Sequence, residues 1–169
     1  MAQTTAPIRA WIGTIIFLLL APGIVAGVIP WLVTGWQWFA WGGAAWVVVP
    51  IAVLGIALGV LFLLHAFALF AVHSGTPAPI APTETLVVTG VYRFVRNPMY
   101  LAVLAIILSQ ALLFGSWPLV IYAGIAFAAV FAFVKGYEEP TLTRTYGEQY
   151  REYQRNVPGW WPRSTPWRA

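Results

Sequence analysis

The chain has 169 residues, of which 60% are apolar and only 8% are charged. Soluble domains carry roughly 25% charged residues, so this composition excludes a water-soluble protein and indicates a single integral membrane domain over residues 1–169. The sequence has no cysteine, which excludes disulfides and cysteine-bound metal centres. His65, His73 and the five acidic residues, all of them Glu, form no clustered ligand set, so no metal site is expected.

The N-terminal part, residues 1–72, contains two apolar segments. Residues 11–33 and 44–72 are each long enough to cross a membrane, because about 20 apolar residues span the hydrocarbon core. Pro22-Gly23 is expected to kink the first segment. The alternative for this segment is a signal peptide with its apolar region between positions 12 and 20. Only Arg9 precedes that region, however, and the apolar pattern continues past the expected cleavage zone.

A loop over residues 73–97 precedes a predicted helical hairpin over residues 98–136. The two segments of the hairpin, 98–114 and 117–135, are separated only by Gly115-Ser116. The first of them is short for a full crossing. The sequence therefore predicts an all-α, polytopic membrane protein with about four transmembrane helices.

Charge predicts how these spans are oriented. With four spans, all nine basic residues lie on the side that holds the N-terminus, the loop and residues 137–169. The positive-inside rule places that side in the cytoplasm, with the plasma membrane of a bacterium or archaeon, or an equivalent, as the expected location. On the opposite side, Trp36, Trp38 and Trp41 are interpreted as an interfacial aromatic belt.

The last part of the chain is predicted to be a cytoplasmic amphipathic helix over residues 140–154. Its apolar stripe has four members: Leu142, Tyr146, Tyr150 and Tyr153. Charged residues occupy the other faces, a pattern that is typical of a helix lying on a membrane surface. A lid or a membrane anchor is its expected role. The following tail, residues 157–162, is expected to lie on the membrane surface as well.

The first polar cluster precedes the third span. Asn97-Pro98 is a strong helix start, since Asn accepts the first free N–H groups and Pro suits the first helical position. Tyr92, Arg93 and Arg96 come just before, in an extended or turn segment. Backbone donors, guanidiniums and phenols together suit a ligand with anionic or heteroaromatic parts. Alternatively, the two arginines only contact lipid phosphates.

The second polar cluster is the pair Glu138-Glu139, at the end of the fourth apolar segment. Adjacent carboxylates repel each other, so they need a partner at a membrane boundary. A cationic ligand or the nearby arginines would supply one. The alternative is that Glu139, which precedes Pro140, only caps the next helix.

In combination, these residues resemble the isoprenylcysteine carboxyl methyltransferase and phospholipid methyltransferase group of integral membrane enzymes. The resemblance covers roughly residues 84–158. It rests on the order and spacing of these elements: Gly90-Val91-Tyr92, Arg96-Asn97-Pro98-Met99-Tyr100, Glu138-Glu139, Tyr146-Gly147-Glu148-Gln149-Tyr150-Arg151-Glu152-Tyr153 and Val157-Pro158.

The resemblance implies an S-adenosylmethionine-dependent methyltransferase, and the sequence indeed lacks the Gly-x-Gly-x-x-Gly fingerprint of a soluble dinucleotide-binding fold. Carried over to this chain, the cofactor-binding residues are Glu84, Thr85, Leu86, Val87, Tyr92, Asn97, Pro98, Met99, Tyr100 and Glu138. Glu138 and Glu139 are the expected catalytic residues, because they are the nearby carboxylates that could take a proton from an amine or thiol.

The expected acceptor is lipophilic or small and apolar, with an O, N or S nucleophile, and it enters laterally from the bilayer. Lys135, Arg96 and His65 are the substrate-side candidates, although a lone intramembrane His more often bonds a neighbouring helix. In the isoprenylcysteine enzymes, an Arg near the position of Lys135 contacts a substrate carboxylate. Lys135 could replace its charge, but an ammonium cannot form the paired hydrogen bonds of a guanidinium. Asn97 replaces the family's common His and cannot act as a base. No nucleic acid is expected as a partner.

Two other functions compete with methyl transfer. One is an NADPH-dependent membrane reductase of the sterol reductase type, whose cofactor phosphate would contact Arg93, Arg96 or Arg155. The other is a non-catalytic membrane partner that retains the fold, which the Asn97 replacement favours.

Overall fold

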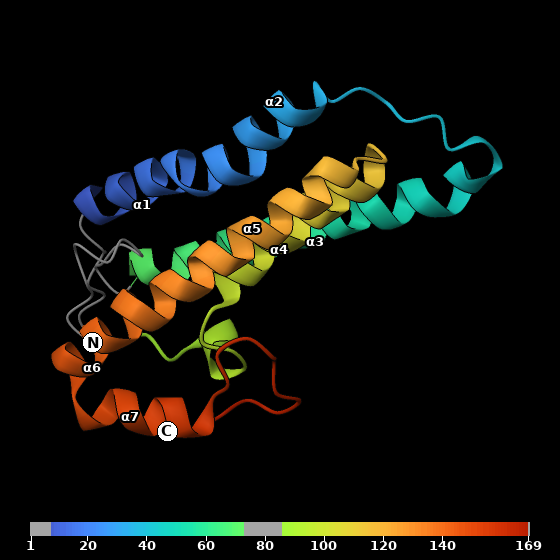
Figure 1. Ribbon diagram of the computed structural model, residues 1–169. Coiled ribbons are helices and arrows are strands. Elements are labelled where there is room, and N and C mark those ends of the chain that lie inside the picture. Colours follow the sequence, from blue (N-terminus) through green and yellow to red (C-terminus); the bar gives the residue numbers. More distant parts are fainter. Residues whose placement is uncertain (1–7, 73–85, 169) are drawn as a thin grey trace.

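The computed structural model describes residues 8–72 and 86–168, and within them the chain forms helices and no strand. The all-α prediction is confirmed. The long helices lie side by side along one axis, with α6 and α7 at one end (Figure 1). The elements are α1 (Ile8–Leu20), the π-helical turn η1 (Ile24–Val28), α2 (Ile29–Thr34), the 3₁₀ turn η2 (Gly42–Ala44), α3 (Ala45–Val72), the 3₁₀ turn η3 (Gly90–Arg93), α4 (Pro98–Leu113), α5 (Trp117–Phe133), the π-helical turn η4 (Val134–Glu138), α6 (Glu139–Tyr146) and α7 (Glu148–Asn156).

Three helical runs are apolar and long enough to cross a membrane: Ile15–Thr34, Gly42–Ala71 and Trp117–Tyr146. Helix α4, with 16 residues, is apolar but shorter. The outer faces of the long runs expose large apolar side chains such as Leu19, Val47 and Ile125, which a hydrocarbon environment would cover. The chain is therefore an integral membrane protein, and three of the expected spans meet the length that a crossing requires.

Helix α4 is held in the bundle by close contact with α3. Gly55 and Gly59 of α3 face it: a Cβ at Gly59 would lie 2.6 Å from Ile106 Cγ1, and one at Gly55 would collide with the hydroxyl of Ser109. Small residues let membrane helices approach this closely. Because α4 also contacts α5, it is fixed on two sides, and so are the site residues at its start.

The first predicted span is interrupted where proline was expected to kink it, and again further along. Helix α1 ends at Leu20, before Pro22. Ahead of Pro30 the helix takes the wider π form in η1. Proline has no N–H to donate to the carbonyl of Ala26, so the regular hydrogen bond is missing there. Gln110 Nε2 donates to that Ala26 oxygen at 2.6 Å. The interruption thus ties the first span to α4.

The helical run from α5 continues through η4 into α6, past the predicted end at residue 135. As in η1, the π-turn lies just ahead of a proline, here Pro140. The single amphipathic helix predicted over 140–154 is wrong. Gly147 divides it with φ 56° and ψ −127°, a conformation that glycine adopts at low cost, and α7 turns back beside the bundle (Figure 1).

The tyrosine stripe does not face outward as a membrane anchor would. Tyr150 and Tyr153 are buried together with Val157, and the residues packed around them are Leu86, Val88, Leu142, Tyr146 and Trp167. The stripe was expected to contact the membrane surface, but the loop before α4 and the chain's own tail cover Tyr150 and Tyr153.

The tail after α7 packs against another part of the chain. It pairs with the segment before α4: Arg96 N–H donates to the Pro158 carbonyl at 3.0 Å and Asn97 N–H to the Gly159 carbonyl at 3.2 Å. Trp161 is 82% exposed. The tail is thus part of the folded body, with one indole left on the outside.

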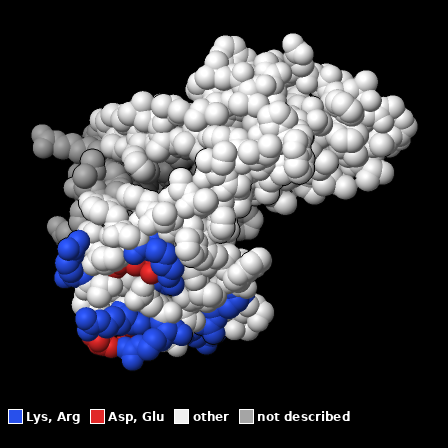
Figure 2. Space-filling model, in the orientation of Figure 1, with Lys and Arg blue, Asp and Glu red and all other residues white. Residues whose placement is uncertain are grey.

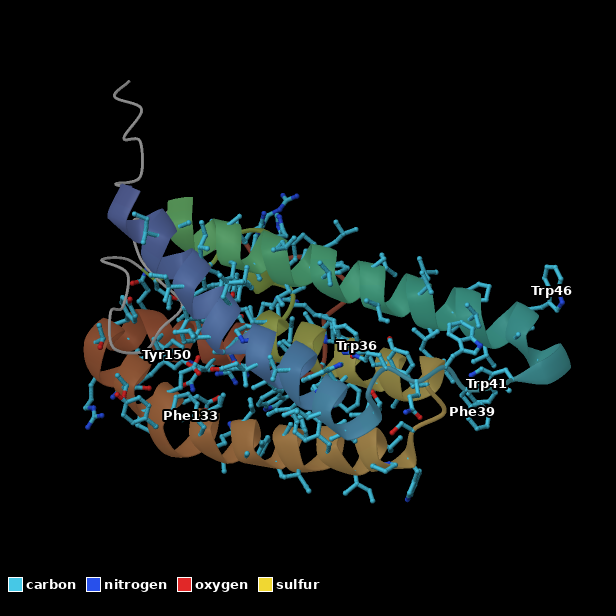
Figure 3. All side chains as sticks on the ribbon, turned by 90° about the horizontal axis from the view of Figure 1, so that it is seen from above. Trp36, Phe39, Trp41, Trp46, Phe133 and Tyr150 are labelled. Atoms are coloured by element: carbon cyan, nitrogen blue, oxygen red, sulfur yellow. The ribbon has the colours of Figure 1, made fainter. Side chains whose placement is uncertain are left out.

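Charged side chains gather at one end of the molecule, around α6, α7 and the tail (Figure 2). This end, which holds Arg96, Lys135, the Glu138-Glu139 pair and α7, is called the charged end below. The opposite end, residues 35–46 and 114–116, is called the far end. Phe39, Trp41 and Trp46 lie there, away from Tyr150 (Figure 3).

Candidate active site

The first motif begins with a turn that only glycine fits. Gly90 has φ 54°, and a Cβ there would lie 2.8 Å from Leu69 Cδ1 and 3.0 Å from His65 Nε2. The turn therefore rests directly on α3, with His65 beside it. Tyr92, two residues on, is buried against Ala66 and Val87.

At the start of α4 the structure differs from the expected capping. Pro98 occupies the first helical turn as predicted, but no side chain caps the helix. Asn97 is only 6% exposed, and its Nδ2 has no hydrogen-bond partner among the residues that the structure describes. The reason is the tail: the bond from Asn97 N–H to the Gly159 carbonyl holds the backbone at φ −115° and ψ 51°, and the side chain lies against Gly159 instead.

Side-chain hydrogen bonds join the two motifs, from Tyr100 to Glu138 and from Arg96 to Glu139. Tyr100 donates its hydroxyl to Glu138 Oε2 at 2.7 Å, across 38 residues of sequence. Tyr100 lies in the first turn of α4, and Glu138 is the last residue of η4. A phenol donating to a carboxylate makes a strong, charge-assisted bond. The Glu138 carboxylate is thus held beside the start of α4.

Glu139 has a different environment from its neighbour. Its carboxylate accepts bonds from Arg96 Nη1 at 3.0 Å and from Lys135 Nζ at 2.9 Å, and its side chain is 11% exposed. A buried carboxylate of this kind requires such partners. Two predicted substrate-side residues, Arg96 and Lys135, are therefore engaged with the second glutamate.

Arg96 also connects the segments around it. Its Nε donates to the Val157 carbonyl at 2.9 Å, and its Nη1 lies 3.4 Å from the Tyr150 hydroxyl. The guanidinium of Arg93 likewise donates to the Trp167 carbonyl at 2.6 Å. Both arginines donate hydrogen bonds to other parts of the protein. The alternative, in which they contact only lipid phosphates, is therefore wrong.

The phenols between these segments stay protonated at physiological pH. Burial raises the pKa of Tyr150 to about 12, against the opposing effect of the Arg96 charge. Burial, with smaller contributions from neighbouring phenols and Glu138, also raises the pKa of Tyr92. The hydroxyl of Tyr153 donates to the Tyr92 carbonyl at 2.6 Å. These phenols therefore do not serve as bases, and Tyr153 positions the loop through its hydrogen bond.

Trp160 is a site residue that sequence reasoning missed. Its ring lies 6.4 Å from that of Tyr100, 5.2 Å from Phe127 and 5.6 Å from Phe131, measured between centroids. Its indole Nε1 is buried and has no hydrogen-bond partner in the described part of the chain. The available signal was its place directly after Val157-Pro158-Gly159, since Val-Pro belongs to the motif on which the resemblance rests.

An apolar pocket opens beside Tyr100, between η1, α4 and α5. Its enclosed volume is small, about 30 Å³, and the rest is open to the outside. The lining residues are Val25, Tyr100, Val103, Leu104, Ile107, Ala126, Phe127 and Val130. Apart from the Tyr100 hydroxyl, these side chains offer only carbon to an occupant.

The structure thus brings most of the expected site residues to the charged end. Val87, Tyr92, Asn97–Tyr100 and Glu138 come from segments that contact one another or are hydrogen-bonded, and Leu86 packs beside them against the tyrosine cluster. Glu84 and Thr85 lie outside the described residues. Within the described ranges, no group of three or more His or Glu side chains could hold a metal ion.

Comparison with known proteins defines the class of this site. Residues 47–149, more than half of the chain, match the family model of the phospholipid methyltransferases. The protein is therefore a membrane methyltransferase, of a kind that normally uses S-adenosylmethionine. It belongs to the phospholipid methyltransferase family. No curated protein and no solved structure matches the chain. The matched region ends before Tyr150, so the tail with Trp160 lies outside it.

Proposed function

We propose that the protein transfers a methyl group from S-adenosylmethionine to a lipophilic acceptor, with the cofactor held between Asn97–Tyr100 and Glu138. The observation that carries this proposal is the 2.7 Å bond between Tyr100 and Glu138. It joins two motifs distant in sequence, and Tyr100 also lines the apolar pocket. The family match favours this function over the reductase alternative.

The chemistry of the site fits the proposed cofactor. S-adenosylmethionine carries a sulfonium, an ammonium and a carboxylate, so its binding site needs both negative charge and hydrogen-bond donors. Glu138 offers negative charge beside the start of α4. The uncapped helix start and the Asn97 amide offer donors, and a helix N-terminus favours negatively charged groups. Tyr92 and Tyr100 supply aromatic surface.

The two glutamates divide their roles in this proposal. When bound, S-adenosylmethionine supplies a methyl group activated by its sulfonium. The new bond would form between the acceptor's lone pair and that methyl carbon, and the carbon–sulfur electron pair would stay on sulfur. Glu138 receives the proton that an amine or thiol acceptor loses. Glu139, paired with Arg96 and Lys135, holds the π-turn that presents Glu138.

Lys135 and the apolar pocket bear on the choice of acceptor. The Lys135 ammonium is paired with Glu139 at 2.9 Å, so a substrate carboxylate would have to compete with that pair. The pocket beside Tyr100 has apolar walls that suit an alkyl or acyl chain. We therefore favour a lipophilic amine or thiol over a prenylcysteine carboxylate. His65, beside Gly90 on α3, remains a candidate for the entry side.

The reaction is placed at the cytoplasmic face of the membrane in this proposal. The gathering of charge at one end of the molecule supports that orientation (Figure 2). Both termini would then be cytoplasmic, and a plasma membrane or an equivalent membrane is the proposed location.

Calorimetry on the detergent-purified protein tests the proposal. We expect S-adenosylhomocysteine to bind and NADPH not to bind. Glu138→Gln should abolish measurable binding, because it removes the negative charge near the cofactor's cationic groups. Glu148→Gln is the matched control, since the Glu148 side chain is 66% exposed on α7. Binding of NADPH alone, or equal binding by the parent and the Glu138 variant, would contradict the assignment.

A further inference from the structure

We propose that Trp160, on the tail beyond the matched family region, is a cofactor-positioning residue: its indole N–H and the Asn97 amide together bind the carboxylate of S-adenosylmethionine. This inference rests on the proposed function. It deepens that function by adding a contact from a segment that neither the sequence motifs nor the family match assigns to the cofactor.

The first evidence is that two buried donors lack partners. Asn97 Nδ2 and Trp160 Nε1 are the buried side-chain nitrogen or oxygen atoms that have no hydrogen-bond partner within the described residues. The Asn97 side chain is more than nine-tenths buried. Native proteins leave few such atoms unpaired, so each one needs an explanation. A ligand that brings an acceptor atom would satisfy them.

The second evidence is that the fold brings these donors to one place. The bond from Asn97 N–H to the Gly159 carbonyl fixes the residue just before Trp160 against the start of α4. A Cβ at Gly159 would lie 3.5 Å from Asn97 Nδ2, so the tail passes directly over this amide. On the other side, the indole ring lies 6.4 Å from that of Tyr100. Asn97 therefore lies under the tail three residues before Tyr100, and the Trp160 ring lies beside the Tyr100 ring.

The third evidence is the kind of group these donors select. Both unpaired atoms are N–H donors, and the adjacent α4 start adds uncapped backbone N–H groups and the positive end of the helix dipole. Such a set favours an anionic oxygen group. Glu138, close by, favours a cation. A ligand that meets both requirements carries opposite charges a short distance apart, as the amino-acid part of S-adenosylmethionine does.

A phospholipid headgroup also combines a phosphate with an amine, so the same chemistry has two possible sources. We assign the contact to the cofactor because both donors adjoin the segment Asn97–Tyr100, where the cofactor is proposed to bind. The apolar pocket proposed for the acceptor is lined by Tyr100 and by residues further along α4 and α5.

Calorimetry with two ligands and paired variants tests this assignment. The ligands are S-adenosylhomocysteine and its decarboxylated analogue, which keeps the ammonium and lacks only the carboxylate. We expect the parent to lose affinity when the carboxylate is removed. Trp160→Phe, which keeps an aromatic ring and removes the N–H, should weaken S-adenosylhomocysteine binding about tenfold, as the loss of one charged hydrogen bond does. It should leave binding of the analogue unchanged.

Trp161→Phe is the matched control, because the neighbouring indole is 82% exposed, and it should bind both ligands like the parent. Asn97→Ala should show the same carboxylate-specific loss as Trp160→Phe. Asn97→His should restore affinity, since an imidazole N–H can donate in place of the amide. A thermal unfolding scan of each variant in the same detergent separates loss of the contact from loss of the fold.

The outcomes separate this inference from the proposed function. If the parent does not bind S-adenosylhomocysteine, the proposed function fails. If the parent binds it and folded Trp160→Phe binds equally well, or loses affinity equally for both ligands, the carboxylate contact is wrong. If only the KM for a phospholipid acceptor rises in that variant, the donors hold the headgroup phosphate, and the assignment to the cofactor is overturned.

Discussion

The two ends of this helical bundle are held together in different ways. At the far end, apolar and aromatic contacts dominate, as between Phe39 and Trp41 at 4.7 Å, with one indole bond from Trp41 Nε1 to the Leu113 carbonyl. At the charged end, the single guanidinium of Arg96 contacts Glu139, Tyr150 of α7 and the Val157 carbonyl at the start of the tail. The comparison indicates that packing builds the spans, whereas a buried polar network builds the site.

The largest expected effect is on stability, from breaking that network at Arg96. Arg96→Met removes the guanidinium and leaves Glu139 buried with Lys135 as its remaining partner. Because one member of a buried ion pair is lost, we expect a destabilisation of about 3 kcal/mol. Denaturant unfolding in detergent, followed by tryptophan fluorescence, measures it.

Arg151→Met is the control for this change, since that side chain is 60% exposed and pairs only with exposed Glu148 in the described structure. A surface pair contributes about 0–1 kcal/mol. If the two variants lost equal stability, the charged end would not depend on the buried network.

The second effect concerns the packing that positions α4. Gly59→Val would force side-chain atoms into Ile106, because even a Cβ at Gly59 would lie only 2.6 Å from Ile106 Cγ1. Overpacking of this kind costs about 1–3 kcal/mol. Gly124→Val on α5 is the control, because nothing lies within 4 Å of a Cβ there. Equal midpoints of unfolding for these two variants would argue against close contact between α3 and α4.

A smaller effect is expected where the tail crosses the first motif. A Cβ at Gly159 would lie 3.2 Å from Arg96 Nη2, so Gly159→Ala should loosen the tail at a cost of about 1 kcal/mol. Limited proteolysis should then cleave the tail faster. At Gly136 a Cβ meets nothing within 4 Å, and Gly136→Ala should leave the cleavage rate unchanged. A tail equally resistant in both variants would contradict the pairing with residues 93–97.

The smallest effect is expected at the far end. Trp41→Phe removes the indole bond to Leu113, and a single hydrogen bond contributes about 1 kcal/mol or less. Affinity for S-adenosylhomocysteine should not change, because the substitution lies at the other end of the bundle. A clear loss of affinity in calorimetry would show that the two ends are coupled.

Much of the fold was predictable because a membrane-spanning helix requires an apolar composition over many consecutive residues. The limits of α3 and α4 follow from composition and from the Asn97-Pro98 start. The break at Gly147 was not predicted, because the periodic tyrosines on either side of it also suit one continuous helix. Glycine after Tyr146 was the local sign of a positive φ, and the amphipathic pattern masked it.

The sequence predicted which residues form the site better than it predicted the contacts between them. Short motifs identified Tyr100 and Glu138, and the structure joins them. The capping by Asn97 failed because the tail, more than 60 residues later, bonds the backbone N–H of Asn97 and lies against its side chain. Contacts over such distances leave no periodic pattern. For the same reason the role of Trp160 had no signal beyond its place after the Val-Pro pair.

Hydrogen–deuterium exchange of the purified protein, with and without saturating S-adenosylhomocysteine, tests the central claim most directly. The site is proposed to lie at the charged end, so the ligand should slow exchange in residues 86–100, 134–140 and 157–161. Exchange in the far-end segment, residues 35–46, should stay unchanged. Protection confined to other segments, or strongest at the far end, would contradict the account.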